Sequence, residues 1–266
     1  MTILVLFAAT LQNIVNQPRR GSWNGVLTVS GTLDKSIQAP MVYRVLVPFL
    51  MRRNPKSLNT YEFIRLVLLW VSLLCVSAYW GASTAVVWLV FVMSAQIFDT
   101  WCYTGEAIGV TMALLGNPIG ALLGTFIHGL SRETVLINGF VYFLATGDFL
   151  WSVAITVFSL TVFFGVRLYQ GKHPLYCERI MLKHNISFLL KQESTRSKES
   201  DVPLFYSPYL NMILIAVSLY GAYLSGYIGL VVVVYVACTF TFGKVNEYRL
   251  NLVPAMWAGA VIAGAL

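Results

Sequence analysis

Charged side chains are scarce in this sequence. Only 11% of its 266 residues are Asp, Glu, Lys or Arg, and 58% are hydrophobic, whereas soluble domains usually carry roughly 25% charged residues. A water-soluble fold of this size could not hide so much apolar surface, because much of any globule faces solvent. The composition therefore excludes an ordinary soluble domain and predicts an integral membrane protein.

Paired cysteines and metal-binding histidine motifs are also missing. The four cysteines stand alone with no CxxC pair, and the three histidines form no HExxH motif, so a zinc site or a disulfide framework has no support. An Arg-rich patch interleaved with aromatic residues, typical of nucleic-acid binding, is absent as well. The net charge of +7 therefore points to membrane lipids or anionic lipid-linked substrates as partners, and to no nucleic acid.

Polar and apolar residues do not alternate in the long apolar runs. Runs near 20 residues instead match the roughly 30 Å of hydrocarbon that a helix must cross. We therefore predict an all-α, polytopic transmembrane helical bundle with about 8–9 spans, forming a single integral membrane domain over residues 1–266. The predicted spans cover residues 2–15, 62–79, 83–98, 107–130, 134–145, 149–169, 208–225, 227–242 and 250–266.

Two long polar loops separate these spans, at about residues 17–60 and 170–207. The first holds seven basic residues and the single acid Asp34, and its apolar stretch 41–51 predicts a helix lying in the membrane interface, kinked by Pro48.

The positive-inside rule places both loops in the cytoplasm, but five predicted spans separate them, which puts them on opposite faces. One explanation is that residues 134–145 do not cross. Another is that the first loop lies outside because its cations grip a lipid phosphate or diphosphate. The third is that the span count is wrong and the first loop is an ordinary cytoplasmic loop.

Three short pieces of the sequence carry a resemblance: YRVLVPFL at 43–50, SRET at 131–134 and EYRLNLVP at 247–254. They resemble uncharacterised polytopic bacterial membrane proteins that are often grouped near the GT-C superfamily of membrane glycosyltransferases. The long first loop, with its acid and interfacial helix, looks like the arrangement in the GT-C superfamily itself. The resemblance implies a polyprenyl-phosphate-linked sugar donor, a multi-pass location in the bacterial inner (plasma) membrane, and catalysis at the outer face. The chain is shorter than typical members and lacks the paired acidic motif that many of them show.

The resemblance also implies roles for residues of the first loop. Asp34 corresponds to the carboxylate that accepts the proton of the acceptor hydroxyl; an exposed turn residue is the alternative interpretation. The departing lipid phosphate needs positive charge. The loop offers this charge from four side chains: Arg44, Arg52, Arg53 and Lys56.

Other charged residues lie close to the apolar runs. Asp99 and Glu106 flank a predicted loop at 99–106; they are seven residues apart, so they would share a face if this segment were helical. They are candidates for an alternative base, for ligands of a divalent metal, or for solvated loop charges. Arg132 and Glu133 are adjacent, so they point in different directions on a helix and each needs a partner elsewhere. Glu247 with Arg249 is the natural partner, for structural pairing or for substrate contact.

The sequence Gly116-Asn117-Pro118 interrupts the predicted span 107–130. Broken helices at membrane depth line cavities, and transporters bind substrates at them. A transporter or flippase of a lipid-like anion is therefore the rival to the glycosyltransferase, and it predicts a cavity at the midplane beside this break. A non-catalytic membrane scaffold subunit, in which the break is a packing kink, is the third possibility.

Overall fold

The computed structural model describes residues 19–85, 88, 100–174, 182–183, 185–186, 208–242 and 252–265. These residues form helices and the turns between them, and no strand occurs in this part of the chain, which confirms the all-α prediction. The predicted span 2–15, most of 83–98 and most of the polar loop 170–207 lie outside the described residues.

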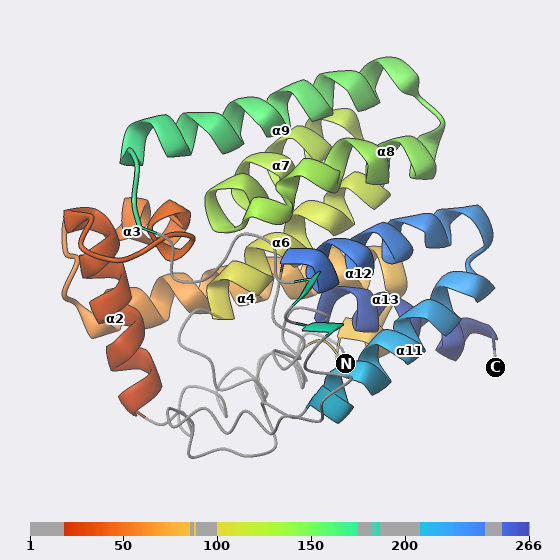
Figure 1. Ribbon diagram of the computed structural model, residues 1–266, viewed down its shortest axis with the longest axis horizontal. Coiled ribbons are helices and arrows are strands. Elements are labelled where there is room, and N and C mark those ends of the chain that lie inside the picture. The colour runs from red at the N-terminus through yellow and green to blue at the C-terminus, as the bar shows by residue number, and fades with distance from the viewer. Residues whose placement is uncertain are drawn as a thin grey trace. The chain divides into compact units, whose positions relative to one another are not determined.

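The chain divides into two compact units, Met1–Tyr176 and Cys177–Leu266, whose helices are labelled in Figure 1. The described elements of the first unit are α2 (Arg19–Asp34), η1 (Met41–Tyr43), α3 (Leu46–Met51), α4 (Leu58–Trp80), α6 (Thr100–Leu114), α7 (Pro118–Ser131), η2 (Glu133–Ile137), α8 (Asn138–Thr146) and α9 (Phe149–Gln170). Those of the second unit are α11 (Pro208–Leu224), η3 (Gly226–Gly229), α12 (Leu230–Phe242) and α13 (Leu252–Ala265).

Two helices, α4 and α9, are long and apolar enough to cross a membrane, judged by length and composition alone. Each begins at a side-chain cap, because Ser57 and Asp148 accept a backbone N–H from the first turns of α4 and α9. Each ends at a glycine with positive φ, Gly81 or Gly171. Both helices agree with predicted spans. The prediction of 8–9 full-length spans is not met, because the other apolar helices in the described part have only 10–17 residues.

The predicted span 107–130 is wrong, because the chain folds back within it to form the antiparallel pair α6 and α7. Gly116 follows α6 in the left-handed region with φ 73°. Asn117 then caps α7 by accepting the Gly120 N–H at 2.9 Å, and Pro118 takes the first helical position. A glycine stop, an asparagine cap and a proline start form a turn between two helices. Asn117 is exposed in that turn.

Small residues let α6 and α7 approach closely. A Cβ added to Gly109 would lie 2.9 Å from the Gly124 carbonyl oxygen, and one added to Gly124 would lie 3.2 Å from the Gly109 Cα. A Cβ on Gly105 would collide with the Ser131 side chain. Glycines spaced by four on facing helices are the usual means of close helix contact in membranes.

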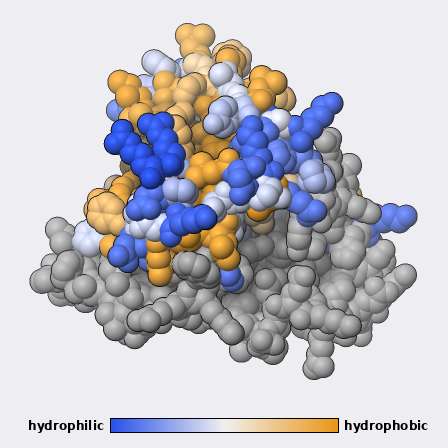
Figure 2. Space-filling view, turned by 90° about the vertical axis from the view of Figure 1, so that its left-hand side faces the viewer, coloured by the Kyte–Doolittle hydropathy of each residue, from blue (hydrophilic) through white to orange (hydrophobic). Residues whose placement is uncertain are grey.

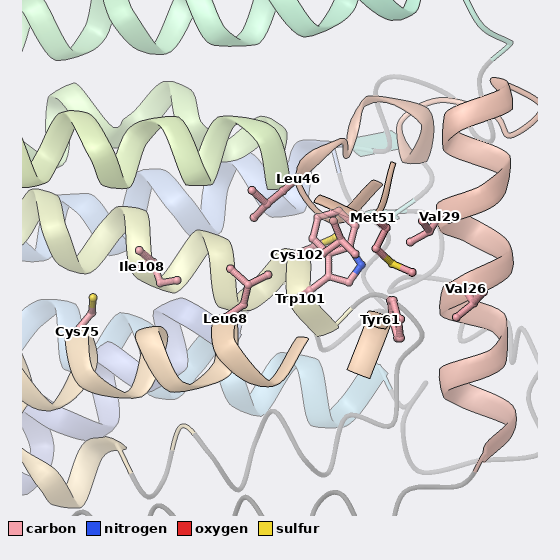
Figure 3. Packing of buried hydrophobic residues seen from close by; sticks show 11 residues of the cluster. Val26, Val29, Leu46, Met51, Tyr61, Leu68, Cys75, Trp101, Cys102 and Ile108 are labelled. Atoms are coloured by element: carbon pink, nitrogen blue, oxygen red, sulfur yellow. The ribbon is translucent and has the colours of Figure 1, made fainter. Parts of the chain in front are cut away.

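The first polar loop is folded rather than extended. The predicted interfacial helix 41–51 is wrong as a single element, since it divides into η1 and α3. Pro48 falls in the first turn of α3, where proline is tolerated. Val47 and Met51 are buried in the apolar cluster that joins α2, α3, α4 and α6, and Figure 3 shows the Met51 side chain among its neighbours Tyr61 and Trp101.

The beginning of the second polar loop meets the first one at one end of the first unit. Gln170, at the end of α9, donates its side-chain N–H to the Val42 carbonyl at 2.8 Å. Lys35 Nζ donates to the Tyr169 carbonyl at 2.9 Å, and the Ala39 N–H donates to the Pro174 carbonyl at 2.9 Å. The first polar segment and residues 170–174 therefore lie together at one end of the first unit, which we call the basic end.

The basic end is rich in exposed cations. They are Lys35, Arg52, Arg53, Lys56 and Lys172. Figure 2 looks onto this end and shows hydrophilic side chains gathered across the described surface between hydrophobic ones. At the opposite end, where α6 turns into α7 and α8 into α9, the described turn residues 115–117 and 146–148 contain no Lys or Arg and one acid, Asp148.

In the second unit, α11 packs against α13 and α12. A Cβ on Gly221 of α11 would collide with Ala258 of α13, and Trp257 Nε1 donates to Ser225 Oγ at 3.2 Å. A Cβ on Gly229 would likewise collide with the backbone of Ala222. This unit is therefore also held together by contacts between small residues.

Candidate functional site

Helix α6 lies at the centre of the first unit. Its residues from Trp101 to Val110 are all buried, because α4, α7 and α8 pack around it. Glu106 lies within this stretch and is 1% exposed. The predicted loop at 99–106 is thus wrong from Thr100 onward: most of it is the first part of a buried helix, and its carboxylate is inside the fold.

Arg132 is the ion-pair partner of Glu106. It stands between α7 and η2 with an extended backbone (φ −152°, ψ 156°), which directs its side chain back toward α6. Arg132 Nη1 donates to Glu106 Oε2, and the guanidinium carbon lies 4.6 Å from the centre of the Tyr103 ring. Arg132 is 6% exposed, so this is a buried charge with a buried counter-ion.

Arg44 approaches the same place from the first polar loop. The Val45 N–H donates to the Leu130 carbonyl at 2.8 Å, which ties the chain around Arg44 to the end of α7. Arg44 is 8% exposed, and its Nη1 lies 3.9 Å from Cys102 Sγ. Arg44 and Arg132 therefore both contact the stretch of α6 from Cys102 to Glu106.

We call Arg44, Tyr103, Glu106, Arg132 and Glu133 the arginine cluster. Glu133 is half-buried and follows Arg132 directly in the chain. Arg132 Nε and Glu133 Oε1 are buried and meet no hydrogen-bond partner among the described residues. Buried arginines are the side chains best suited to grip a phosphate, because the guanidinium presents a planar fork of donors.

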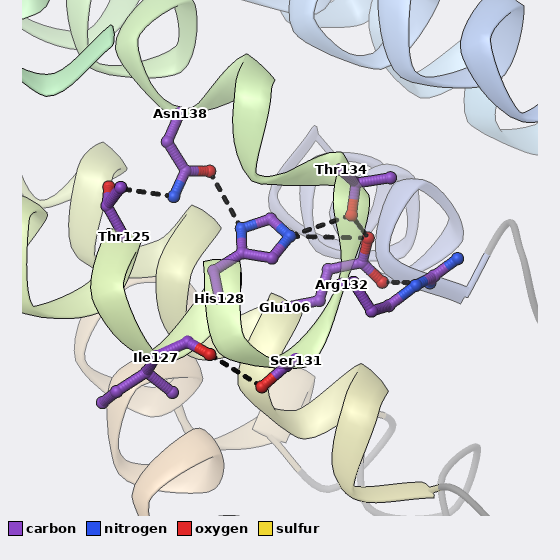
Figure 4. A network of polar contacts seen from close by, with 8 residues as sticks. All are labelled: Glu106, Thr125, Ile127, His128, Ser131, Arg132, Thr134 and Asn138. Atoms are coloured by element: carbon purple, nitrogen blue, oxygen red, sulfur yellow. Dashed lines mark hydrogen bonds and ion pairs between the residues drawn. The ribbon is translucent and has the colours of Figure 1, made fainter. Parts of the chain in front are cut away.

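A chain of polar side chains extends from Glu106 away from the arginines (Figure 4). Thr134 Oγ1 donates to Glu106 Oε1 and lies 2.9 Å from His128 Nε2. His128 Nδ1 lies 3.0 Å from Asn138 Oδ1, and Asn138 Nδ2 donates to Thr125 Oγ1 at 3.1 Å. We call these five residues the His128 chain.

Sequence reasoning placed Arg44, Glu106, Arg132 and Glu133 among the candidate residues, and the structure brings these four together. It did not single out His128, Thr134 or Asn138. No helical spacing relates His128 to Arg132, because α7 ends at Ser131 and Arg132 has an extended backbone.

The other predicted site residues lie apart from the arginine cluster. Arg52, Arg53 and Lys56 are exposed, and Arg52 stacks over the Phe49 ring at 4.8 Å. Asp34 is exposed at the end of α2, where it accepts the Ser36 N–H at 2.9 Å. Hydrogen bonds from the Ser36 hydroxyl and N–H hold the pKa of Asp34 below its usual value, which makes it a weaker base.

Asp99 and Arg249 lie outside the described residues, so their predicted roles stay predictions. A divalent metal was one predicted use of Asp99 and Glu106. In the described part of the chain, no group of three or more His, Cys, Asp or Glu side chains is arranged to hold a metal ion.

Comparison with known proteins finds no relative of this chain. No protein-family model matches the chain, and neither the curated proteins nor the solved structures include a match. The resemblance to GT-C glycosyltransferases therefore stays a prediction. Two of the three pieces that carry it are neighbours in space, since YRVLVPFL contains Val45 and SRET follows Leu130 directly.

Proposed function

We propose that the chain is a multi-pass helical membrane protein and that its first unit binds the phosphate of a lipid or lipid-linked sugar at the arginine cluster. The membrane part of the proposal is supported by the surface of α9. This helix of 22 residues is about 33 Å long at 1.5 Å per residue, enough to cross roughly 30 Å of hydrocarbon. Large apolar side chains stand exposed along its whole length: Phe149, Leu150, Trp151, Val153, Val157, Leu160, Phe164, Leu168 and Tyr169.

Lysine substitution along α9 tests this assignment. Val157 is 56% exposed near the middle of the helix, so Val157→Lys is expected to cost about 2.5–3.5 kcal/mol of membrane insertion. Leu168, 83% exposed, is two residues from the end of α9, where a lysine reaches the interface, so Leu168→Lys is the matched control and is expected to insert normally. The inserted fraction of each chain is measured by glycosylation mapping. A Val157→Lys chain that is soluble and folded without detergent would contradict the proposal.

The charge distribution supports an orientation. Exposed cations concentrate at the basic end of the first unit, so the positive-inside rule places that end in the cytoplasm together with the first polar segment and residues 170–174. The chain turns at Gly116 between α6 and α7. This turn divides one of the five predicted spans between the two polar loops into two, so the number of spans between the loops becomes even. An outward-facing first loop is then not needed to satisfy the rule.

Cysteine labelling tests the orientation. In a chain whose four native cysteines are replaced by serine, we expect Lys35→Cys and Lys172→Cys to react with an impermeant maleimide from the same, cytoplasmic side. Asp148→Cys, at the opposite end, is expected to react from the other side. Labelling of the two lysine positions from different sides would contradict the shared basic end.

The single observation that carries the binding site is that two arginines, each more than nine-tenths buried, contact the same stretch of α6: Arg44 at Cys102 and Arg132 at Glu106. They come from different elements, and each guanidinium presents a planar fork of donors that suits a phosphate. Ionisable residues within membrane segments usually mark a functional site. A lipid phosphate is the anion that a cluster at the basic end would meet, because lipid headgroups lie at that level of the bilayer.

Binding measurements test the site. We expect the full chain in nanodiscs to bind a short-chain prenyl phosphosugar or short-chain phosphatidylglycerol, and not the zwitterionic phosphatidylcholine analogue. Arg44→Gln and Arg132→Gln should each weaken binding about tenfold or more, since each removes charge-assisted hydrogen bonds worth about 1.5–3 kcal/mol. The control, Arg53→Gln, changes an exposed arginine of the same loop. An equal loss with Arg53→Gln would mean that general surface charge attracts the ligand.

The two ligands distinguish a lipid-linked substrate from an ordinary headgroup. Preference for the prenyl phosphosugar supports glycosyl transfer, at the cytoplasmic face rather than at the outer face that the resemblance implies, and with Glu106 in place of Asp34 as the carboxylate beside the arginines. Preference for phosphatidylglycerol supports a binding or scaffold role. The rival transporter hypothesis predicted a midplane cavity at Asn117, and that residue lies instead in an exposed turn.

A further inference from the structure

The His128 chain contains a hydrogen-bond arrangement that fixes the number of its protons. Asn138 Oδ1 only accepts, so His128 Nδ1, 3.0 Å away, carries a hydrogen. His128 Nε2 faces Thr134 Oγ1 at 2.9 Å, and Thr134 Oγ1 in turn faces Glu106 Oε1. The threonine hydroxyl has one hydrogen, which can serve only one of these two contacts.

The second contact therefore needs a further proton. If Thr134 donates to Glu106, then His128 Nε2 must also carry a hydrogen and the ring is cationic. If Thr134 donates to His128, then Glu106 Oε1 must carry the hydrogen and the carboxyl is neutral. The two forms interconvert when Nε2 passes its proton to Oγ1 while Oγ1 passes its own to Oε1. Both hold one proton more than a neutral histidine with an ionised glutamate.

This proton changes the charge next to the arginines. The charged and polar groups near His128 and Glu106 are Tyr103 on α6, Arg132 and Glu133 after α7, Arg44 from the first loop, and Asn138 on α8. On α4, which also packs against α6, Arg65 is paired with Glu62 at 2.7 Å. From α9, Val162 packs against α7 at Gly129 and carries no charge. With the proton present, His128 and Glu106 together are neutral. Without it they carry one negative charge within reach of Arg132, which opposes a bound phosphate.

We propose that His128, Thr134 and Glu106 hold one exchangeable proton, and that this proton and a lipid phosphodiester at the arginine cluster strengthen each other's binding. The linkage rests on the proposed function, and it is reciprocal because the two ligands share one free-energy cycle. The phosphate-bearing ligand is thus bound together with a proton taken from solution, and loss of that proton lowers the affinity for the ligand.

The pH dependence of binding tests the linkage in the full chain in nanodiscs. The probe is short-chain phosphatidylglycerol, whose phosphodiester does not itself titrate between pH 5 and pH 10. We expect its affinity to be constant at low pH and then to fall by up to about tenfold per pH unit over one window as the proton is lost. Glu106→Gln and Thr134→Val are expected to flatten this window. Ser159→Ala, which removes a buried hydroxyl that bonds only within α9 at 2.8 Å, should keep it.

A second measurement needs no ligand. Nitrogen-15 NMR of histidine-labelled protein, with His128 assigned from a His128→Gln chain, is expected to show an Nδ1–H and a proton at Nε2 that exchanges with Thr134 and Glu106. Pure Nδ1–H imidazole with an ionised Glu106 would overturn the proton site, as would an Asn138 amide that presents Nδ2 to the ring. Binding that stays independent of pH would overturn the linkage and leave the proposed function intact. No binding at any pH would overturn the proposed function and the linkage, while the NMR result still decides the proton site.

Discussion

Replacing Glu106 with alanine is expected to lower the free energy of unfolding by about 3–5 kcal/mol. The substitution leaves the Arg132 guanidinium buried without the carboxylate that receives its Nη1 hydrogen bond. It also removes the acceptor of the Thr134 hydroxyl. An unpaired buried charge is among the few single changes with an effect of this size. Reversible unfolding of the detergent-solubilised chain, followed by circular dichroism, measures the loss.

A double substitution separates the ion pair from its surroundings. Glu106→Ala combined with Arg132→Met removes both charges, so the double variant should be more stable than Glu106→Ala alone. Asp34→Asn is the matched control for a carboxylate, since Asp34 is exposed, and it is expected to change stability by less than about 0.5 kcal/mol. A Glu106→Ala chain as stable as Asp34→Asn would show that the two side chains are not paired.

Adding one methyl group at Gly109 is expected to destabilise the first unit by about 1–3 kcal/mol or more. The new Cβ of Gly109→Ala would lie 2.5 Å from the His128 Cβ and 2.9 Å from the Gly124 carbonyl oxygen. The second of these is a backbone atom, so α6 and α7 must separate rather than rearrange a side chain. Because the His128 side chain would be displaced, the hydrogen-bond distances within the His128 chain should change too. The same unfolding measurement reports the effect.

Gly165 is the matched control, because it lies in the interior of α9 and a Cβ there meets nothing within 4 Å. Gly165→Ala is expected to be neutral or to stabilise the chain by about 0.5–1 kcal/mol through helix propensity. A loss of stability at the first glycine and no loss at the second would show that the packing of α6 against α7 decides the effect. Equal effects would mean that propensity alone decides and that α6 and α7 are not in close contact.

The ends of α4 and α9 could be predicted because their signals are local. Ser57 and Asp148 are caps, and a glycine follows the last turn of each helix. The break at Gly116 was predicted from an equally local signal, but the reversal of the chain there was not, because the apolar residues on both sides continue one run. The length of an apolar run therefore does not tell whether it forms one helix or two antiparallel helices.

The arginine cluster could be predicted only in part. Arg44 and Arg132 were candidates for their charge, but their proximity depends on a backbone hydrogen bond between Val45 and Leu130, which residues far apart in sequence provide. Glu106 was placed in a loop because a carboxylate is costly in a buried helix. That cost is offset by Arg132, 26 positions later, and such a partner cannot be seen from neighbouring residues.

The ion pair between α6 and the residue that follows α7 also affects how the chain is inserted into the membrane during its synthesis. Helix α6 has 15 residues, about 22 Å at 1.5 Å per residue, and carries Glu106, so it is a poor candidate for insertion by itself as it leaves the ribosome. Its counter-ion emerges only after α7 has been synthesised. We therefore expect the translocon to hold α6 until α7 follows and to release the two helices into the bilayer as one hairpin.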